Sequence, residues 1–278
     1  MSGPPAALCG VLGHPVGHSR SPAMHNAAFG ALGLDWRYVR LPVPPERFDE
    51  LVRALPASGY RGANATIPHK LAALRAADDA TPAARAIGAA NTLTFEDGRI
   101  EADNTDAAGL VDALARPLAG LRALVLGAGG AGRAAAWALR EEGAEVAVWN
   151  RTPERAAELA ADLGVRAAER PAAAHGAAPP DLLVNATAVG LDAAAGHDEA
   201  IASLGLDGAE PPPVVVDLVY RGDGETPVVR WARAAGADVV EGLEVLVRQG
   251  ARSLERWTGR PPPLDVMRTA AANSAPET

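Results

Sequence analysis

Ala123-Leu-Val-Leu-Gly-Ala-Gly-Gly-Ala-Gly132 is the stretch that decides the predicted fold. Apolar residues typical of a buried strand run directly into a glycine-rich turn, and a helical pattern over residues 131–142 follows. Glycines permit a tight turn and let a pyrophosphate reach the helix N-terminus, where free N–H groups and the helix dipole favour an anion. In this context the turn predicts a dinucleotide-binding loop. Its members are Gly127, Ala128, Gly129, Gly130 and Ala131.

The end of the next strand discriminates between NAD and NADP. Asn150-Arg151-Thr152 follows that strand, where an NAD-binding site usually places an Asp or Glu for the ribose 2′-hydroxyl. No acid stands there. The Arg151 guanidinium suits a phosphate oxygen or stacking on adenine, and Thr152 adds a hydroxyl donor. NADP is therefore the predicted cofactor, against the alternative that Arg151 is a solvated residue at a helix start.

Asn185-Ala-Thr187 ends a later strand of the same half of the chain. Loops at the carboxyl ends of parallel strands line the ligand crevice of such sheets, so this segment is expected to face the cofactor. Asn185 is equally well interpreted as a turn-forming residue.

Extended and helical patterns alternate along the whole chain, which predicts an α/β protein with two domains. Strands are expected at 7–12, 36–41, 62–67, 91–96, 99–102, 123–127, 145–149, 181–185, 214–219 and 238–240. Helices are expected at 22–32, 46–55, 69–76, 106–115, 131–142, 153–163, 226–235 and from residue 242 to about 257. Asp97-Gly98 predicts a hairpin turn, and the tail from Arg260 is expected to be partly frayed. A break at Arg116-Pro117 separates two strand-helix series. The first domain is assigned to residues 1–105, the second to 106–240, and the C-terminal helix with its tail to 241–278.

Composition excludes several classes of function. The 278 residues carry a formal net charge of −8 with arginines scattered among acids, so neither nucleic acid nor a membrane is an expected partner. No apolar run approaches the roughly eighteen residues that a membrane span needs, and a lone cysteine cannot form an intrachain disulfide. We expect a cytoplasmic protein that binds a small molecule, with a homodimer as one option for its assembly.

Lys70 is the only lysine in the chain, against twenty-five arginines. Arginine stays protonated at any ordinary pH, whereas a lysine amine can have its pKa moved by its surroundings and can then exchange a proton. Asn64 and Thr66 alternate with apolar residues on the strand that leads to Lys70, so they could hydrogen-bond a polyol. Asp106 stands at a helix entry, either as a cap or as the carboxylate that orients the Lys70 amine for acid/base catalysis. A surface lysine left over by chance is the alternative.

The segment Gly13-His-Pro-Val-Gly-His-Ser-Arg-Ser-Pro22 lies between the first strand and the first helix. Ser21 is expected to cap that helix, and Ser19 with Ser21 makes a good seat for a carboxylate. His14 and His18 have the spacing of a helical metal pair, but the Pro and Gly between them argue against a helix. Because no cysteine or acid cluster lies nearby either, no metal is predicted.

Taken in order, these motifs resemble those of the shikimate dehydrogenases. The matching segments are Gly-x-Pro-x-x-His-Ser-x-Ser-Pro, Asn-x-Thr-x-Pro-x-Lys, Asp-Asn-Thr-Asp, Gly-Ala-Gly-Gly-Ala, Asn-Arg-Thr and Asn-Ala-Thr, and the resemblance runs from about residue 8 to residue 259. It implies an N-terminal substrate domain with a mostly parallel sheet, a Rossmann-type NADP-binding domain, and a C-terminal helix that returns to the first domain. The activity it implies is the NADP-dependent, reversible reduction of 3-dehydroshikimate to shikimate, on the route to chorismate and the aromatic amino acids.

The resemblance also implies a role for each matching residue. Ser19 and Ser21 would hold the substrate carboxylate, while Lys70 and Asp106 would be the catalytic pair. The residues implied to contact the ring or to complete the substrate site are Asn64, Thr66, Asn91, Tyr220 and Gln249. Those implied for the cofactor, besides the glycine-rich loop, are Asn150, Arg151, Thr152, Asn185, Thr187 and Gly242.

Some positions depart from the family pattern. Ala188, Leu191 and Val245 stand where the family often has Ser, Met and Met, and these changes are expected to bear on cofactor affinity. Ser21, where quinate-preferring relatives often carry Thr, favours shikimate. The rival interpretations are a quinate or aminoshikimate dehydrogenase on the same scaffold, and a sensor that binds shikimate-like acids without turning them over. A sensor would be expected to lack Lys70 or Asp106.

Overall fold

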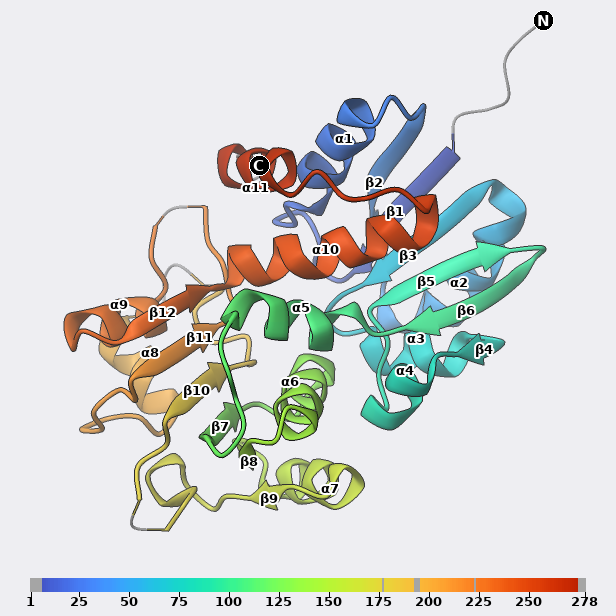
Figure 1. Cartoon of the computed structure of the whole chain (residues 1–278). Coiled ribbons are helices and arrows are strands. Elements are labelled where there is room, and N and C mark those ends of the chain that lie inside the picture. The colour runs from blue at the N-terminus through green and yellow to red at the C-terminus, as the bar shows by residue number, and fades with distance from the viewer. Residues whose placement is uncertain (1–6, 177, 193–195, 223, 275–278) are drawn as a thin grey trace, which may run out of the picture. The chain divides into compact units, whose positions relative to one another are not determined.

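The chain divides into two compact units, each with a sheet and a core of its own (Figure 1). The computed structural model describes residues 7–176, 178–192, 196–222 and 224–274. Unit 1 comprises Met1–Gly109 and Leu246–Thr278, and unit 2 comprises Leu110–Val245. The C-terminal segment therefore belongs to the same unit as the N-terminal part of the chain, which confirms the expected return of the last long helix.

Unit 1 is built on a six-stranded sheet in the order β2-β1-β3-β5-β6-β4. Its strands are β1 (Ala7–Gly13), β2 (Trp36–Pro42), β3 (Tyr60–Ala65), β4 (Asp79–Ala80), β5 (Thr92–Glu96) and β6 (Arg99–Asp103). The pairs β1–β2, β1–β3 and β4–β6 run parallel, whereas β5 runs antiparallel to both β3 and β6. The sheet is thus mostly parallel, as predicted. Asp97 and Gly98, with φ of 50° and 77°, form the predicted hairpin turn between β5 and β6.

Helices cover both faces of this sheet. They are α1 (Ser21–Ala31), α2 (Phe48–Ala54), α3 (Lys70–Ala76), α4 (Pro82–Ile87), the start of α5 (Thr105–Leu114), most of α10 (Gly242–Thr258) and α11 (Leu264–Asn273), with short 3-10 turns at Pro45–Arg47 and Pro56–Ser58. A core of aliphatic residues packs α2 and α3 against one face, around Phe48, Val52 and Leu93. An aromatic cluster joins α1, β2 and α10 within the unit, and is made of His25, Phe29, Tyr38 and Trp257.

Unit 2 is a parallel sheet in the order β12-β11-β10-β7-β8-β9. Its strands are β7 (Arg122–Leu126), β8 (Glu145–Trp149), β9 (Arg166–Ala167), β10 (Leu182–Asn185), β11 (Val214–Asp217) and β12 (Asp238–Glu241). Its helices are the end of α5, α6 (Gly130–Glu141), α7 (Pro153–Leu163), α8 (His197–Ser203), α9 (Pro227–Ala234) and the start of α10, with a 3-10 turn at Pro171–Ala173.

Alternation along each strand of unit 2 builds two separate cores. Ala123 and Val125 of β7 pack with α6 and α7, whereas Leu124 and Leu126 pack with α8 and α9. Helices consequently lie on both faces of the sheet (Figure 1), which is the predicted Rossmann-type arrangement.

Three local predictions are wrong. The tail from Arg260, expected to be partly frayed, forms α11 over Leu264–Asn273, whose Met267 and Ala271 are fully buried; residues 275–278 lie outside the described residues. Ser21 does not cap α1: the helix begins at Ser21 itself, the flanking Arg20 gives no side-chain cap, and Ser21 N–H instead bonds Ser19 Oγ. The strand expected to reach residue 67 ends at Ala65, so Thr66 lies just beyond it. Besides these, the sequence patterns do not predict α4, α8 or the two-residue strands β4 and β9.

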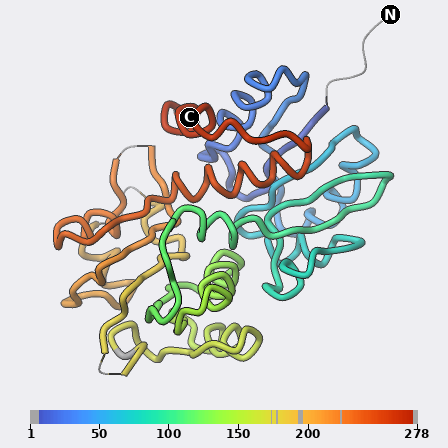
Figure 2. The backbone as a smooth tube through the Cα atoms, in the orientation of Figure 1, coloured from blue at the N-terminus to red at the C-terminus, as the bar shows by residue number. Residues whose placement is uncertain are grey.

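The packing of α11 explains why this tail is helical. Figure 2 shows the red C-terminal segment beside the blue α1, and Arg20 Nη1 donates to Ala271 O at 3.0 Å near the C-terminal end of α11. A guanidinium at the carbonyl end of a helix satisfies free acceptors and opposes the helix dipole.

Within the described residues, no helix combines the length and the apolar composition needed to cross a bilayer.

Met267→Ala should lower the free energy of unfolding by about 2–5 kcal/mol, because it removes a fully buried side chain between α11 and its neighbours. Val266→Ala is the matched control, since the neighbouring Val266 is 39% exposed and should change stability by less than about 0.5 kcal/mol. Urea unfolding followed by circular dichroism measures both. Equal, small effects of the two substitutions would contradict a packed α11.

Candidate active site

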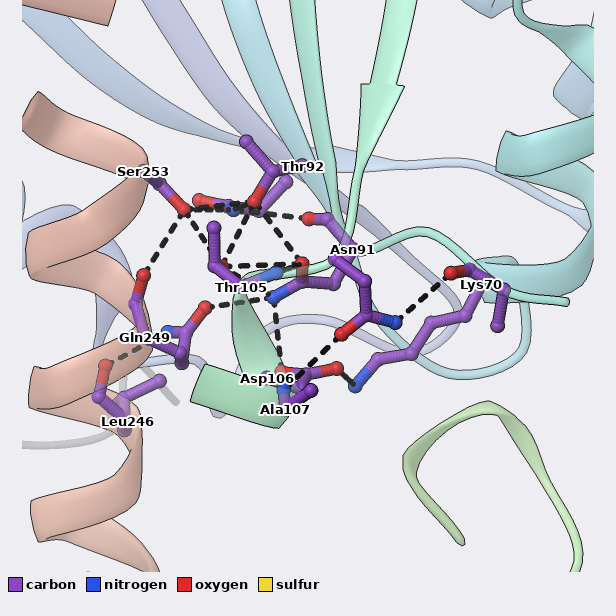
Figure 3. A network of polar contacts seen from close by, with 12 residues as sticks. Lys70, Asn91, Thr92, Thr105, Asp106, Ala107, Leu246, Gln249 and Ser253 are labelled. Carbon is purple, nitrogen blue, oxygen red and sulfur yellow. Dashed lines mark hydrogen bonds and ion pairs between the residues drawn. The ribbon is translucent and has the colours of Figure 1, made fainter. Parts of the chain in front are cut away.

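Lys70 and Asp106 form an ion pair in unit 1 (Figure 3). Lys70 is the first residue of α3 and Asp106 the second of α5, and Lys70 Nζ donates to Asp106 Oδ2 at 2.6 Å. The two side chains are only 13% and 17% exposed. The lone lysine is therefore no surface residue left over by chance.

The turn before α3 is held by His69, which is buried next to Lys70. Its ring nitrogen Nε2 lies 2.7 Å from Val43 O, and the ring stacks on Phe48. Its backbone N–H donates to Thr66 O at 2.7 Å. Burial lowers the pKa of His69, while the bond to Val43 O opposes this shift, so the ring is neutral at neutral pH. These bonds fix the backbone turn from which the Lys70 side chain reaches Asp106.

Both carboxylate oxygens of Asp106 are occupied within the unit. Asn91 Nδ2 donates to Oδ1 at 2.9 Å, opposite the Lys70 bond to Oδ2. The helix-capping alternative for Asp106 does not hold, because Asn104 Oδ1 accepts from Ala107 N–H at the start of α5. Asp106 is thus positioned as the partner of an amine.

The Asn91 amide is fixed from both ends (Figure 3). Its Oδ1 accepts from the Thr105 backbone N–H at 2.7 Å and from the Thr92 hydroxyl at 3.1 Å. Its Nδ2 lies within 3.0 Å of Thr105 Oγ1, Asp106 Oδ1 and Gln249 Oε1. Since a backbone N–H can only donate, the amide oxygen must face Thr105 and the amide nitrogen must face Asp106.

Helix α10 contributes two polar side chains to the same network. Gln249 accepts from Asn91 through Oε1 and donates to Leu246 O at 2.8 Å. Ser253, fully buried one turn later, lies 2.8 Å from Thr92 Oγ1 and 3.2 Å from Thr105 Oγ1. Gly109 permits this approach, because a Cβ there would come within 2.7 Å of the Gln249 backbone.

Asn64, at the carboxyl end of β3, joins the network from the other side. Its Nδ2 donates to Asn91 O at 3.0 Å and lies 2.9 Å from Ser253 Oγ, and its Oδ1 accepts from the Tyr38 hydroxyl at 2.7 Å. Unit 1 therefore brings Lys70, Asp106, Asn91, Gln249 and Asn64 together, as a hydroxy-acid site would require. Thr66, two residues after Asn64 in the sequence, is half-buried.

Ser19 and Ser21 are both buried at the start of α1. Arg40 Nη2 donates to Ser19 O at 2.8 Å, which ties this segment to β2. Burial and the Arg40 charge lower the pKa of the adjacent His18, so no second positive charge is added there. Among the described residues, no group of three or more His, Cys, Asp or Glu is arranged to hold a metal ion.

In unit 2 the glycine-rich loop has the geometry of a dinucleotide cradle. Gly127 has a φ of 105°, and a Cβ on Gly132 would come within 1.9 Å of Gly127 O. At Gly129, by contrast, a Cβ would meet nothing within 4 Å, and this N-cap of α6 has no side-chain hydrogen bond. An open loop with an uncapped helix start fits a pyrophosphate group.

The segment after β8 is the one that the sequence predicts to meet the ribose end of NADP. Asn150 Oδ1 accepts from Ala128 N–H at 3.2 Å, which braces the glycine-rich loop. Arg151 and Thr152 are exposed, and within the described residues Arg151 makes no ion pair and Thr152 gives no cap to α7. Arg155, which the sequence reasoning did not consider, is also exposed in the first turn of α7.

The turn-forming interpretation of Asn185 is confirmed. Its Oδ1 accepts from Thr187 N–H and from the Thr187 hydroxyl, the latter at 2.7 Å, and its Nδ2 donates to Asp217 Oδ1 at 2.8 Å. Asp217, buried at the end of β11, also accepts from Thr226 and from Val219 N–H. Sequence reasoning missed Asp217, although a carboxylate ending an apolar strand was a visible signal.

Two further predicted residues also lie in unit 2. Tyr220 follows β11 by three residues and is half-buried. Gly242 begins α10, where a Cβ would come within 2.6 Å of Leu218 O, so a close approach requires glycine.

A unit with a buried Lys–Asp pair in a polyol-like polar network, and a unit with a dinucleotide cradle, are the parts of a dinucleotide-dependent oxidoreductase. Family models match most of the chain: Shikimate dehydrogenase substrate binding domain over residues 11–93, Shikimate / quinate 5-dehydrogenase over 110–205, and Shikimate 5'-dehydrogenase C-terminal domain over 242–272. The chain belongs to the shikimate dehydrogenase family.

Individual relatives agree with this assignment. The chain is 48% identical over 270 residues to the shikimate dehydrogenase (NADP(+)) of Anaeromyxobacter dehalogenans, covering 92% of each. Its fold is similar to the crystal structure of shikimate 5-dehydrogenase from Thermus thermophilus in complex with NADP(H) and shikimate, with 43% identity, a TM-score of 0.81, and 95% and 98% of the two chains covered. The shikimate dehydrogenase of Aquifex aeolicus has a TM-score of 0.88 at 32% identity, covering 98% of this chain and 100% of its own.

Asp217→Asn should change how stability depends on pH. Burial raises the pKa of Asp217 to about 6 from an ordinary 3.8, with the nearby Glu241 adding to the shift and hydrogen bonds opposing it. Between these values the folded protein binds more protons than the unfolded chain, so this contribution to stability is full below about pH 4 and is lost as the pH rises to about 6. The loss is about 3 kcal/mol, because each of the roughly two pH units between the two pKa values is worth about 1.4 kcal/mol.

Urea unfolding at several pH values between 4 and 7 measures this contribution as the difference between wild type and Asp217→Asn. That difference should fall with rising pH, whereas the exposed Asp207→Asn should give a flat difference. A flat difference for Asp217→Asn as well would show that the carboxyl is not perturbed in the folded protein.

Proposed function

We propose that this protein catalyses the reversible, NADP-dependent reduction of 3-dehydroshikimate to shikimate. The observation that carries the proposal is the Lys70–Asp106 pair at 2.6 Å inside a network of amides and hydroxyls. NADP supplies or accepts the hydride when bound. A cytoplasmic location and a homodimer remain predictions.

In the reducing direction the Lys70 ammonium gives a proton to the carbonyl oxygen of the substrate as it becomes a hydroxyl, and in the reverse direction the Lys70 amine takes it back. Asp106 holds the nitrogen in place in both states through its Oδ2. Asn91 keeps Asp106 from turning away by its bond to Oδ1. Proton transfer by a positioned group of this kind contributes about 100- to 10,000-fold to the rate.

Substrate recognition is assigned to the polar residues of unit 1. Ser19 and Ser21 hold the carboxylate, while Asn64, Thr66 and Gln249 address the ring hydroxyls. Asn91, whose amide is already bonded at both ends, holds Asp106 and Gln249 in place beside the substrate. Tyr220 keeps the substrate-contacting role that the family pattern implies. The retention of both Lys70 and Asp106 supports an enzyme over a non-catalytic sensor.

The direct test is oxidation of shikimate with NADP, followed at 340 nm, with quinate and aminoshikimate as competing substrates and NAD as competing cofactor. Shikimate with NADP is expected to give the highest kcat/KM. A higher kcat/KM for quinate or aminoshikimate would show that the protein is instead a quinate or aminoshikimate dehydrogenase with the same fold.

Lys70→Met and Lys70→Arg should each lower kcat by at least about 100-fold while shikimate still binds. Methionine removes the amine, whereas arginine keeps the charge but resists losing a proton, so the pair separates proton transfer from electrostatic attraction. Steady-state kinetics and a shikimate titration measure the effects, with urea unfolding as a check on folding. Wild-type turnover in a folded Lys70→Met would refute the catalytic assignment.

Arg151→Ala should raise the KM for NADP by about 10- to 100-fold, as expected for loss of a charge-assisted hydrogen bond to a phosphate worth about 1.5–3 kcal/mol. The KM for NAD should hardly change, because NAD lacks the 2′-phosphate. Arg230→Ala, an exposed arginine on α9, controls for the change in net charge. Equal effects of Arg151→Ala on both cofactors would show that Arg151 does not contact that phosphate.

A further inference from the structure

We propose that Tyr38 is a positioning residue that fixes the oxygen end of the Asn64 amide, whose nitrogen end is bonded inside the unit, so that Asn64 offers only an oxygen to the substrate. The site therefore requires a hydrogen-bond donor, a hydroxyl or an amine, on the group that meets Asn64. This inference rests on the proposed function, because it takes Asn64 to contact the substrate. It specifies that the substrate is the donor in that hydrogen bond, and it assigns a positioning role to Tyr38, which does not itself touch the ring.

The amide nitrogen of Asn64 is fully used inside unit 1. One acceptor of its protons is the backbone carbonyl of Asn91 at 3.0 Å, which can only accept and so decides which end of the amide faces it. Ser253 Oγ at 2.9 Å and Thr92 Oγ1 at 3.1 Å share the other side of the same nitrogen. With two protons and three acceptors in reach, Nδ2 has no proton left for a ligand.

The amide oxygen keeps a single site. An amide oxygen has two lone pairs, and the Tyr38 hydroxyl donates to one of them at 2.7 Å. One lone pair remains, which can only accept. A hydroxyl or an ammonium can therefore bond to Asn64, while a fluorine, a carbonyl or a methyl ether at the same place would meet the oxygen as a second acceptor.

Tyr38 is itself held rigidly. It is 2% exposed on β2, and its backbone N–H and carbonyl both bond the Asn26 side chain, at 2.8 and 2.9 Å. Its ring stacks on His25 with centroids 4.3 Å apart and planes 7° from parallel, and Trp257 lies 6.1 Å away. The hydroxyl consequently cannot follow Asn64 if the amide moves.

The support from His25 does not change with pH. Neither ring nitrogen of His25 has a hydrogen-bond partner within the part of the chain that the structure describes, and burial lowers its pKa to about 3. The ring is thus neutral at any pH at which the protein would be assayed, and it acts as a flat wall behind Tyr38.

The test combines a tyrosine variant with altered ligands. Wild type and Tyr38→Phe are titrated by calorimetry with shikimate and with two analogues, each carrying fluorine in place of one of the two ring hydroxyls that do not react. Tyr60→Phe is the matched control, because Tyr60 lies on the neighbouring β3, and its hydroxyl takes no part in the network. Turnover of shikimate is followed on the same samples.

One fluorinated analogue should bind wild type about 10- to 100-fold more weakly than shikimate, as expected when a buried acceptor is left unpaired. Tyr38→Phe should bind shikimate about 3- to 10-fold more weakly, mainly as a rise in KM rather than a fall in kcat. It should also discriminate less against that same analogue, because the oxygen end of the amide is no longer fixed. A coupling of this kind between the Tyr38 hydroxyl and one ring hydroxyl would support the inference. Tyr60→Phe should behave as wild type.

Two results would overturn the inference. One is equal binding of shikimate and both analogues to wild type. The other is a Tyr38→Phe variant that matches wild type in affinity and in discrimination. Failure of the proposed function is distinguishable, because shikimate would then bind with the stated discrimination and yet not be oxidised.

Discussion

The bond between the Asn91 amide oxygen and the Thr105 backbone N–H is the constraint on which the candidate site depends. It fixes which end of a buried amide faces which neighbour, and from it follow the bonds of the amide nitrogen to Asp106 and to Gln249. The start of β5, the start of α5 and the middle of α10 thereby share one side chain. Burying an amide lowers the stability of the folded protein unless each of its polar atoms has a hydrogen-bond partner. Loss of any one of these bonds should therefore disturb the geometry of the whole site.

The same logic organises unit 2 around Asp217. Its carboxylate accepts from Asn185, Val219 N–H and Thr226, and so links the ends of two adjacent strands to the start of α9. Asn185 in turn forms the turn that carries Thr187. In unit 2, then, residues named by sequence motifs are held by a buried polar residue, Asp217, that no motif singled out as a site residue. In unit 1 the corresponding residue, Asn91, was itself among the predicted site residues.

The fold was largely predictable from the sequence because it rests on local signals. Apolar strands that run into glycine-rich turns, and the Asp97-Gly98 hairpin, depend on neighbours in the chain. The failures have a non-local cause. Helix α11 is stabilised by packing on α1 and by Arg20, some 250 residues earlier, and its polar, alanine-rich sequence carried no strong pattern of its own. Ser21 looked like a cap because capping residues precede Pro so often, but the helix begins one residue earlier.

Residues of the candidate site could be proposed from the sequence, but the hydrogen-bond network that joins them could not. Chemistry suggested Lys70, Asp106 and Asn64, while Ser253 and Tyr38 were invisible, since a serine in a helix and a tyrosine in a strand carry no chemical signal until the chain brings them beside Asn64. The choice between a cap and a catalytic partner for Asp106 likewise needed the competing side chain, Asn104, to be located.

Because Lys70 is the only lysine, its amine can be observed alone by NMR of protein labelled with 15N at the lysine side chain. If the network holds this amine for proton transfer, its signal should shift when shikimate is added, and Asp106→Asn should alter the signal in the absence of substrate. A sharp signal at the position of a free lysine, insensitive both to shikimate and to Asp106→Asn, would contradict the central role given to this pair.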